Sequence, residues 1–442
     1  MKNLKNYIYI LAATVFVAAC KPNFNSNPAP SKGTADFTRY ISVGNSLTAG
    51  YADGGLYLTG QLNSYPSIIA SQMASVGGGT FNQPLFAASQ SNGSGYLKLT
   101  GFDASGNPIT TSVTTNLAYV GVATVPGFGN VNLLAKYTGN IDNYGVPGIK
   151  LLHLTYAPYA NLNPYFDRML STTSPNNTTT YLSLITSKPF TFFTNWLGNN
   201  DALGYATGGG GGYATADALT DPNTFAQLYT LLIGTLTANG AKGACATIPD
   251  VTTIPYFTTI TVPLVLATVQ KAVPTVQALY INAADATGTN YAPRIATAAD
   301  LIVLTFPTSK MGVPNGSGYP YGLDPRNPIE TQYVLDVNEQ ALVKTAVNSY
   351  NATIKSVAAS KGLAVFDAFT FLTNIKASGY VINGLNLNSN YISGGIFSLD
   401  GVHLTPRGYS IVANQFISAI NSTYGSSIPL ANVSAYNGII FP

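Results

Sequence analysis

The chain has few residues of the kinds that bind metals or give a protein a strong charge. Its 442 residues include two histidines and two cysteines, too few to predict a zinc site, and we expect no metal and no organic cofactor. Charged residues make up 8% of the chain, whereas about a quarter is typical of globular domains. The net charge is +3 and no basic cluster is present, so nothing indicates nucleic-acid binding.

The N-terminal residues have the composition of an export signal. Lys2 and Lys5 precede an apolar stretch, residues 7–19, that is too short to span a bilayer. Small residues and a cysteine end the stretch at 17–20 (VAAC), which resembles the signal and lipobox of bacterial lipoproteins. A cleaved signal peptide with an incidental cysteine is the alternative interpretation.

The lipoprotein resemblance implies a protein that is anchored to a membrane. Residues 1–19 are then the signal peptide, Cys20 carries the acyl chains, and the Pro-, Asn- and Ser-rich residues 20–35 form a flexible tether. In lipoproteins of this kind, an acidic residue directly after the lipidated cysteine marks retention in the inner membrane. Residue 21 is a lysine, so the resemblance implies the outer membrane of a bacterial cell envelope. Cys245 then has no partner for an internal disulfide, and its apolar surroundings predict a buried structural cysteine.

Residues 36–442 are predicted to form one α/β domain. Apolar strand-like runs alternate with helical patterns, which indicates a mostly parallel sheet with helices on both faces. The run 189–197 (PFTFFTNWL) is apolar enough for a strand that is buried on both faces. Strands are expected at 40–44, 189–197, 244–248 and 363–366, and helices at 65–75, 222–238, 337–360 and from Thr405 onward.

Three large insertions interrupt the alternation, near residues 81–142, 207–219 and 251–330. Long loops in a compact domain usually shape a binding site or are disordered. We expect the first and third insertions to form walls of the substrate cleft. The second contains five consecutive glycines, 208–212, but no Lys-Ser/Thr or Gly-x-Gly follows them. A flexible loop is therefore favoured over a phosphate cradle.

Two distant segments carry the residue types of a hydrolytic triad. Ser46 follows the predicted strand 40–44, where the side chains of a parallel sheet reach the ligand crevice. Asp400 precedes His403 by three residues in a Gly-containing turn, a spacing at which the carboxylate can orient the imidazole. Each segment alone is more commonly an ordinary loop hydroxyl, a helix cap or a surface turn. Their joint occurrence favours the triad.

Three other polar residues invite functional readings that the sequence does not favour. His153 lies among leucines, which is typical of a packed structural histidine rather than of a ligand or a general acid. Asp250 and Asp367 each follow a predicted strand and could suggest a pair of glycosidase carboxylates. Their spacing gives this no support, and we expect both to cap loops.

Four short blocks, in this order along the chain, resemble those of the SGNH hydrolase superfamily, also called GDSL hydrolases. The blocks are 44–48 (GNSLT), 143–148 (NYGVPG), 198–201 (GNND) and 400–403 (DGVH). The resemblance implies a three-layer α/β fold with Ser46 as the nucleophile, His403 as the base and Asp400 as its partner. It also implies that the backbone N–H of Gly148 and the side-chain amide of Asn200 bind the oxyanion.

One residue departs from the pattern of the family. Asn45 stands where the first block usually has an aspartate. An amide can still accept a hydrogen bond from the loop backbone, so we expect the local structure to persist without the electrostatic role of a carboxylate. Asp201, directly after Asn200, is expected to order its loop.

The expected activity is that of a serine esterase acting on carboxylic esters, either acyl or O-acetyl groups. Ser46 N–H, Gly148 N–H and Asn200 Nδ2 would form the oxyanion hole. The substrate is a small-molecule, glycan or lipid ester: insertions rich in Tyr and Asn favour carbohydrate esters, whereas an apolar cleft would favour lipids. The alternative is a surface lipoprotein that binds glycan and has weak catalysis or none.

Overall fold

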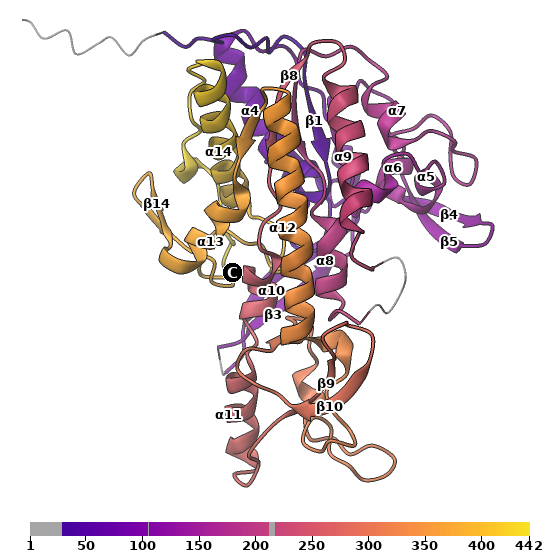
Figure 1. The fold of residues 1–442 in the computed structure, drawn as a ribbon, viewed down its shortest axis with the longest axis vertical. Coiled ribbons are helices and arrows are strands. Elements are labelled where there is room, and N and C mark those ends of the chain that lie inside the picture. The colour runs from indigo at the N-terminus through magenta and orange to yellow at the C-terminus, as the bar shows by residue number, and fades with distance from the viewer. Residues whose placement is uncertain (1–28, 105, 212–216) are drawn as a thin grey trace, which may run out of the picture.

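The computed structural model describes residues 29–442 except residue 105 and residues 212–216 (Figure 1). The predicted signal peptide, residues 1–19, and the predicted lipidation site at Cys20 lie outside the described residues and stay predictions. No helix within the described ranges is both long enough and apolar enough to cross a membrane.

The described end of the predicted tether, residues 31–35, packs against the C-terminal part of the chain. Ser31 N donates to Ser427 Oγ at 2.8 Å, and Thr34 N donates to Tyr424 O at 2.9 Å. The folded domain therefore begins a few residues before the boundary that composition suggested.

Five parallel strands form the central sheet, in the order β13-β8-β7-β1-β6. All residues of β1 and β7 are buried, as their nearly continuous apolar sequences predict for a parallel sheet covered on both sides. The predicted mostly parallel α/β sheet is confirmed. The strands are β1 (Tyr40–Gly44), β6 (Asn143–Gly145), β7 (Phe192–Trp196), β8 (Lys242–Ala246) and β13 (Ala364–Phe366).

Helices cover both faces of this sheet. Two successive residues of β7, Asn195 and Trp196, contact helices on opposite faces. The ring of Trp196 meets the ring of Phe416 from one helix pair, with ring centroids 6.0 Å apart. Asn195 points to the other face, where its Nδ2 donates to Tyr229 OH at 3.2 Å. One pair is α4 with α14 and the other is α9 with α12 (Figure 1). The helices are α2 (Ser46–Ala49), α3 (Leu58–Leu62), α4 (Tyr65–Met73), α5 (Tyr159–Leu162), α6 (Pro164–Asp167), α7 (Tyr181–Ile185), α8 (Asn200–Thr207), α9 (Pro222–Leu236), α10 (Pro255–Thr258), α11 (Val262–Ala272), α12 (Val337–Ser360), α13 (Ala368–Ser378) and α14 (Pro406–Tyr424).

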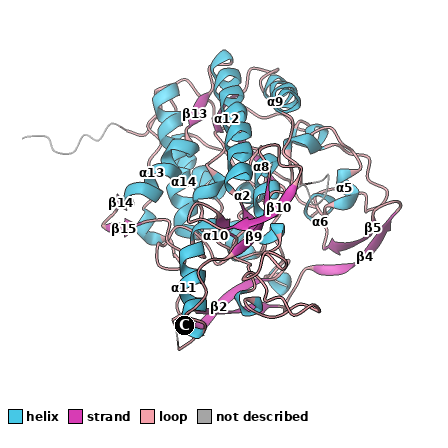
Figure 2. Cartoon of the chain, turned by 60° about the horizontal axis from the view of Figure 1, so that its bottom comes forward, coloured by secondary structure: helices cyan, strands magenta, loops and turns pink. Residues whose placement is uncertain are grey.

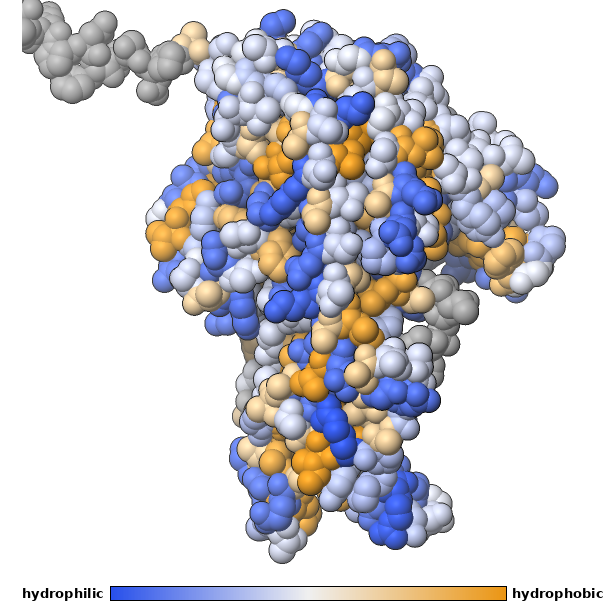
Figure 3. All heavy atoms as spheres, in the orientation of Figure 1, coloured by the Kyte–Doolittle hydropathy of each residue, from blue (hydrophilic) through white to orange (hydrophobic). Residues whose placement is uncertain are grey.

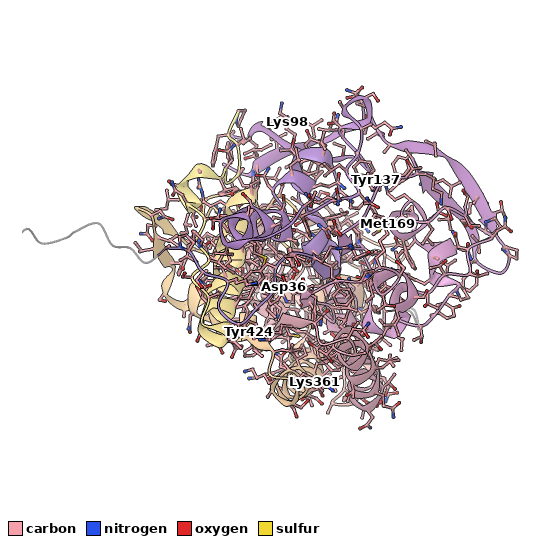
Figure 4. The ribbon with its side chains drawn as sticks, turned by 90° about the horizontal axis from the view of Figure 1, so that it is seen from above. Asp36, Lys98, Tyr137, Met169, Lys361 and Tyr424 are labelled. Carbon is pink, nitrogen blue, oxygen red and sulfur yellow. The ribbon has the colours of Figure 1, made fainter. Side chains whose placement is uncertain are left out.

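The first insertion folds into two antiparallel hairpins, β2 (Tyr96–Phe102) with β3 (Pro108–Val113) and β4 (Tyr119–Val125) with β5 (Gly129–Leu134). Figure 2 shows the β4–β5 hairpin projecting from the right-hand edge of the molecule. Seen from above, Lys98 of β2 and Lys361, just after α12, lie on opposite sides of the molecule (Figure 4). The β2–β3 hairpin therefore stands on the side away from α12.

The third insertion carries α10, α11 and a further hairpin, β9 (Tyr280–Ala284) with β10 (Tyr291–Ile295). Two short pairs complete the strands, β11 (Leu301–Ile302) with β12 (Val334–Leu335) and β14 (Tyr380–Ile382) with β15 (Leu385–Leu387). On the face that carries α12 and α9, polar and apolar residues are interspersed (Figure 3).

Candidate active site

Ser46 stands at the carboxyl end of a central strand, where β1 ends at Gly44 and α2 begins. Asn45 Oδ1 accepts from Leu47 N at 3.1 Å and caps α2, which is the local role expected of an amide in place of an aspartate. The turn is tight, because an added Cβ on Gly44 would lie 2.1 Å from Thr48 Oγ1. Ser46 is only 7% exposed, so its hydroxyl has a defined position.

The sequence-predicted Ser46, His403 and Asp400 come together in a continuous chain of hydrogen bonds. His403 Nε2 lies 2.8 Å from Ser46 Oγ, although the two residues are 357 positions apart. His403 Nδ1 lies 2.8 Å from Asp400 Oδ2. With the ring proton on Nδ1, toward the carboxylate, Nε2 is the acceptor for the Ser46 hydroxyl. This arrangement can remove a proton from the serine.

The Asp400 carboxylate accepts five hydrogen bonds. Its Oδ2 accepts from His403 Nδ1 and from Gly54 N at 2.9 Å. Its Oδ1 accepts from His403 N at 2.8 Å, from Val402 N at 2.9 Å and from Ser398 Oγ at 3.1 Å. Burial alone raises the pKa of Asp400, but the adjacent imidazole and these donors outweigh it and hold the pKa below its ordinary value.

The turn after α2 supports Asp400 in a way that the sequence did not reveal. Asp53 has a positive φ of 53°, and its Oδ1 accepts from Leu399 N at 2.9 Å. Its backbone N donates to Ser398 Oγ at 2.9 Å, and Gly54 N reaches Asp400 directly. Burial raises the pKa of Asp53, and the charge of Asp400 adds to this. No local motif signals these contacts, because they join residues about 350 positions apart.

His403 is held by the start of α14 and by one aromatic ring. Thr405 caps α14, with its Oγ1 accepting from Gly408 N at 3.1 Å. Ser398 N donates to His403 O at 2.8 Å. The ring of Tyr51 lies 4.6 Å from the imidazole, centroid to centroid. The imidazole therefore has little freedom to turn away from Ser46.

The two predicted oxyanion donors differ in their placement. Asn200 begins α8 and lines the same cavity as Ser46, and its Nδ2 donates to Ile149 O at 2.9 Å. An amide nitrogen carries two hydrogens, so the second can serve a ligand. Gly148 has a left-handed φ of 82°, which favours glycine, but it is not among the described residues that line this cavity.

Asp201 directly follows Asn200, and its carboxylate is hydrogen-bonded to the chain segment that follows Gly148. Its Oδ2 accepts from Leu151 N at 2.7 Å and its Oδ1 accepts from Thr220 Oγ1 at 2.7 Å. Burial raises the pKa of this carboxyl to about 6, although both hydrogen bonds oppose the shift. Asp201 lies in the first turn of α8 and not in a loop, and it ties Leu151 and Thr220 to that helix.

The remaining candidates have structural roles. His153 Nδ1 accepts from Lys150 N at 3.1 Å, and its ring stacks on Tyr159 with centroids 3.8 Å apart. Burial lowers the pKa of His153 to about 4, and the charge of Lys150 adds to this. Asp250 and Asp367 cap short helical segments after their strands, with Oδ1 accepting from a backbone N–H two or three residues on.

Cys245 lies in β8 and is completely buried, and burial raises the pKa of its thiol to about 11. A buried thiol of this kind is inert, as expected of a structural cysteine. Within residues 29–442, leaving out 105 and 212–216, no three His, Cys, Asp or Glu side chains gather into a potential metal site.

An inner cavity and an outer cleft flank the imidazole. The inner cavity is small, with a volume of about 50 Å³, and the outer cleft is larger, with a volume of about 550 Å³. Residues of the first and third insertions line the outer cleft. The inner cavity is lined by Asn45, Ser46, Leu47, Trp196, Asn199, Asn200, Leu203, Pro249, Val251, Ile254, Leu372, Phe397, Val402, His403 and Leu404. The outer cleft is lined by Tyr51, Gly54, Leu97, Thr110, Leu203, Thr207, Tyr256, Leu304, Thr305, Tyr391, Leu399, Asp400, Val402 and His403.

The family model of the GDSL-like lipase/acylhydrolases matches residues 40–416, a span that includes Ser46, Asp400 and His403. Among curated proteins, no sequence matches the chain. A similar solved structure is the lipase/acylhydrolase from Enterococcus faecalis, which has 12% sequence identity, a TM-score of 0.33, and coverage of 89% of this chain and 100% of that one. The chain belongs to the GDSL-like lipase/acylhydrolase family.

Proposed function

We propose that the protein is a serine esterase that hydrolyses carboxylic esters through Ser46, His403 and Asp400. The observation that carries the proposal is the unbroken hydrogen-bonded path from Ser46 Oγ through both imidazole nitrogens to the Asp400 carboxylate, with two distances of 2.8 Å. Family membership supports hydrolysis of ester bonds in general. The residues in this path supply the mechanism.

In the first half of the reaction, Ser46 Oγ attacks the ester carbonyl carbon and its proton passes to His403 Nε2. The carbonyl oxygen becomes an oxyanion as the tetrahedral intermediate forms. When the intermediate collapses, the bond to the alcohol oxygen breaks, and Nε2 returns the proton to that oxygen. The products are a free alcohol and an acyl-Ser46 ester. Asp400 stabilises the imidazolium that exists between the two proton transfers.

In the second half, a water molecule replaces the alcohol. His403 Nε2 takes a proton from the water as its oxygen attacks the acyl carbon. When the second tetrahedral intermediate collapses, the bond between the acyl carbon and Ser46 Oγ breaks, and Nε2 returns that proton to Oγ. The products are a carboxylic acid and the regenerated serine. The two halves use the same imidazole, so one hydrogen-bonded path serves both.

The proposed oxyanion donors are Ser46 N–H, Gly148 N–H and the Asn200 amide. Asn200 has the better support, because it lines the cavity that contains Ser46 and has a second N–H to offer. Removal of one such donor typically lowers kcat by about 10²–10³-fold.

Substitution of the proposed nucleophile tests the function. Ser46→Ala should lower kcat for p-nitrophenyl butanoate by about 10⁴-fold or more, because the acyl-enzyme cannot form. Ser75→Ala, which removes an exposed hydroxyl that donates to Gln72 O at 2.8 Å, is the matched control. Retention of activity in Ser46→Ala would remove the serine mechanism. Absence of activity in the wild type would favour the non-catalytic glycan-binding alternative.

A further inference from the structure

The inner cavity and the outer cleft touch the proposed reaction centre at different points. The inner cavity is lined by both Ser46 and His403. The outer cleft is lined by His403 and Asp400, and Ser46 is not among its described lining residues. The cleft therefore opens on the imidazole side of the centre, whereas the inner cavity opens beside the serine.

The proton transfers assign a part of the substrate to each space. His403 Nε2 must give its proton to the leaving alcohol oxygen, so the alcohol departs on the imidazole side. The acyl group stays bonded to Ser46 and must extend away from that side. We propose that the outer cleft binds the alcohol portion of the ester as a neutral polyhydroxylated ring, a sugar, and that the acyl group lies toward the apolar inner cavity. This rests on the serine-esterase function proposed above.

Among the described residues that line it, the outer cleft has aromatic side chains but no Lys or Arg. Three tyrosines, Tyr51, Tyr256 and Tyr391, line it, and each is partly exposed. Asp400 and His403 are its only ionisable lining groups besides tyrosine among the described residues. A phosphate or carboxylate on the alcohol would therefore have no cation to pair with and would approach the Asp400 carboxylate. A neutral alcohol avoids both the free-energy cost of desolvating an unpaired anion and the repulsion from Asp400.

Hydroxyl groups are interspersed with these aromatic rings. Tyr256 OH and Thr305 Oγ1 lie 3.2 Å apart as a hydrogen-bonded pair, and Thr305 is exposed. Thr110, from β3, is also exposed and lines the same cleft. A sugar ring has an apolar C–H face and a rim of hydroxyls. Its face can lie on a tyrosine ring while its rim bonds to threonine hydroxyls.

The inner cavity has the opposite character. Its polar lining residues, Asn45, Ser46, Asn199, Asn200 and His403, belong to the segments that form the reaction centre. The rest of its wall is apolar. It is formed by Leu47, Trp196, Leu203, Pro249, Val251, Ile254, Leu372, Phe397, Val402 and Leu404.

Matched esters test the alcohol assignment. The probes are methyl 6-O-butanoyl-glucopyranoside and ethyl butanoate, which share an acyl group and a primary alkyl leaving group. We expect the wild type to show a kcat/KM at least tenfold higher for the glucoside ester. Tyr256→Ala should lower this ratio at least fivefold, and Thr305→Val, a change at an exposed position, should lower it about threefold. Tyr156→Ala removes a tyrosine that is 42% exposed and outside the cleft, and is the matched control.

The outcomes separate the inference from the function on which it rests. A wild-type ratio near one, or an equal loss for both esters in Tyr256→Ala and in Thr305→Val, would overturn the sugar assignment while leaving the esterase intact. Hydrolysis of p-nitrophenyl butanoate that does not depend on Ser46 would instead defeat the proposed function.

Discussion

At Asp400, every hydrogen-bonding neighbour in the described structure is a donor. Three backbone N–H groups, the Ser398 hydroxyl and His403 Nδ1 all point at its two oxygens. Such a site suits an ionised carboxylate and no other group of similar shape. It keeps the Nδ1 proton directed at Asp400 and leaves Nε2 free to accept from Ser46.

Replacement of Asp400 by asparagine should therefore lower kcat strongly. An amide group at Oδ2 would meet Nδ1 as a donor and force the imidazole into the tautomer that carries its proton on Nε2. The Ser46 proton would then have no acceptor, and kcat should fall about 10⁴-fold. The measurement is the kcat of purified Asp400→Asn with p-nitrophenyl butanoate.

Asp367→Asn is the matched control, since it removes a carboxylate that caps a helix on the surface. Near-wild-type kcat in Asp400→Asn, with unchanged thermal unfolding, would show that the carboxylate does not set the tautomer.

The sequence was sufficient to predict the residues of this site that belong to short motifs. Ser46, Asp400 and His403 meet as predicted. Asp53 and Ser398 could not be predicted as supports of Asp400, because this role depends on a contact between two turns from opposite ends of the chain. Asn45 shows the reverse case, since its capping of α2 depends on local sequence and was predictable.

At the scale of elements, the start of α12 combines a helix cap with a buried acid. Asp336 and Glu339 form a reciprocal capping box, in which Glu339 Oε2 accepts from Asp336 N at 3.1 Å. Glu339 Oε1 also accepts from Gly211 N and Tyr291 OH, both at 2.9 Å. One carboxylate thus links α12 to the glycine-rich segment and to the β9–β10 hairpin. Burial raises its pKa to about 7, and the charge of Asp336 adds to this.

The raised pKa predicts a pH dependence of stability. Between pH 4.5, the ordinary pKa of the group, and about 7, the folded state retains a proton that the unfolded state has lost. The contribution of Glu339 to stability is therefore fully present below pH 4.5 and falls as pH rises toward 7. The melting temperature of the wild type minus that of Glu339→Gln should decrease across this interval. A difference that is constant from pH 4.5 to 7 would contradict the assignment.

Element boundaries were predicted well where local signals end an element. α12 covers Val337–Ser360 as predicted, because Asp336 caps its start and Gly362, with a φ of 61°, follows its end. β8 was predicted at 244–248 but covers Lys242–Ala246. Ile248, which continues the apolar run, leaves the sheet and bonds to Asn351 of α12 instead. Apolar periodicity cannot distinguish burial in the sheet from burial against a helix.

At the scale of the whole molecule, the structure of the long insertions could not be predicted from the sequence. The insertion 81–142 was expected as a long segment outside the alternation of strands and helices, and the structure has two hairpins there. Which residues of an insertion face the cleft depends on the docking of each hairpin and helix, and so Leu97, Thr110 and Tyr256 were not identifiable in advance. Four strands of the central sheet were expected from their apolar runs, whereas β6 (Asn143–Gly145) was expected only as part of a motif and not as a strand.

The central claim is that residues from both ends of the chain meet to activate Ser46. The most direct measurement exposes the protein to a fluorophosphonate probe and maps the adduct by peptide mass spectrometry, for the wild type and for His403→Ala. The account predicts one adduct on Ser46 in the wild type and almost none in His403→Ala, because the imidazole no longer accepts the serine proton. An adduct on another serine, or equal labelling of Ser46 in both proteins, would contradict it.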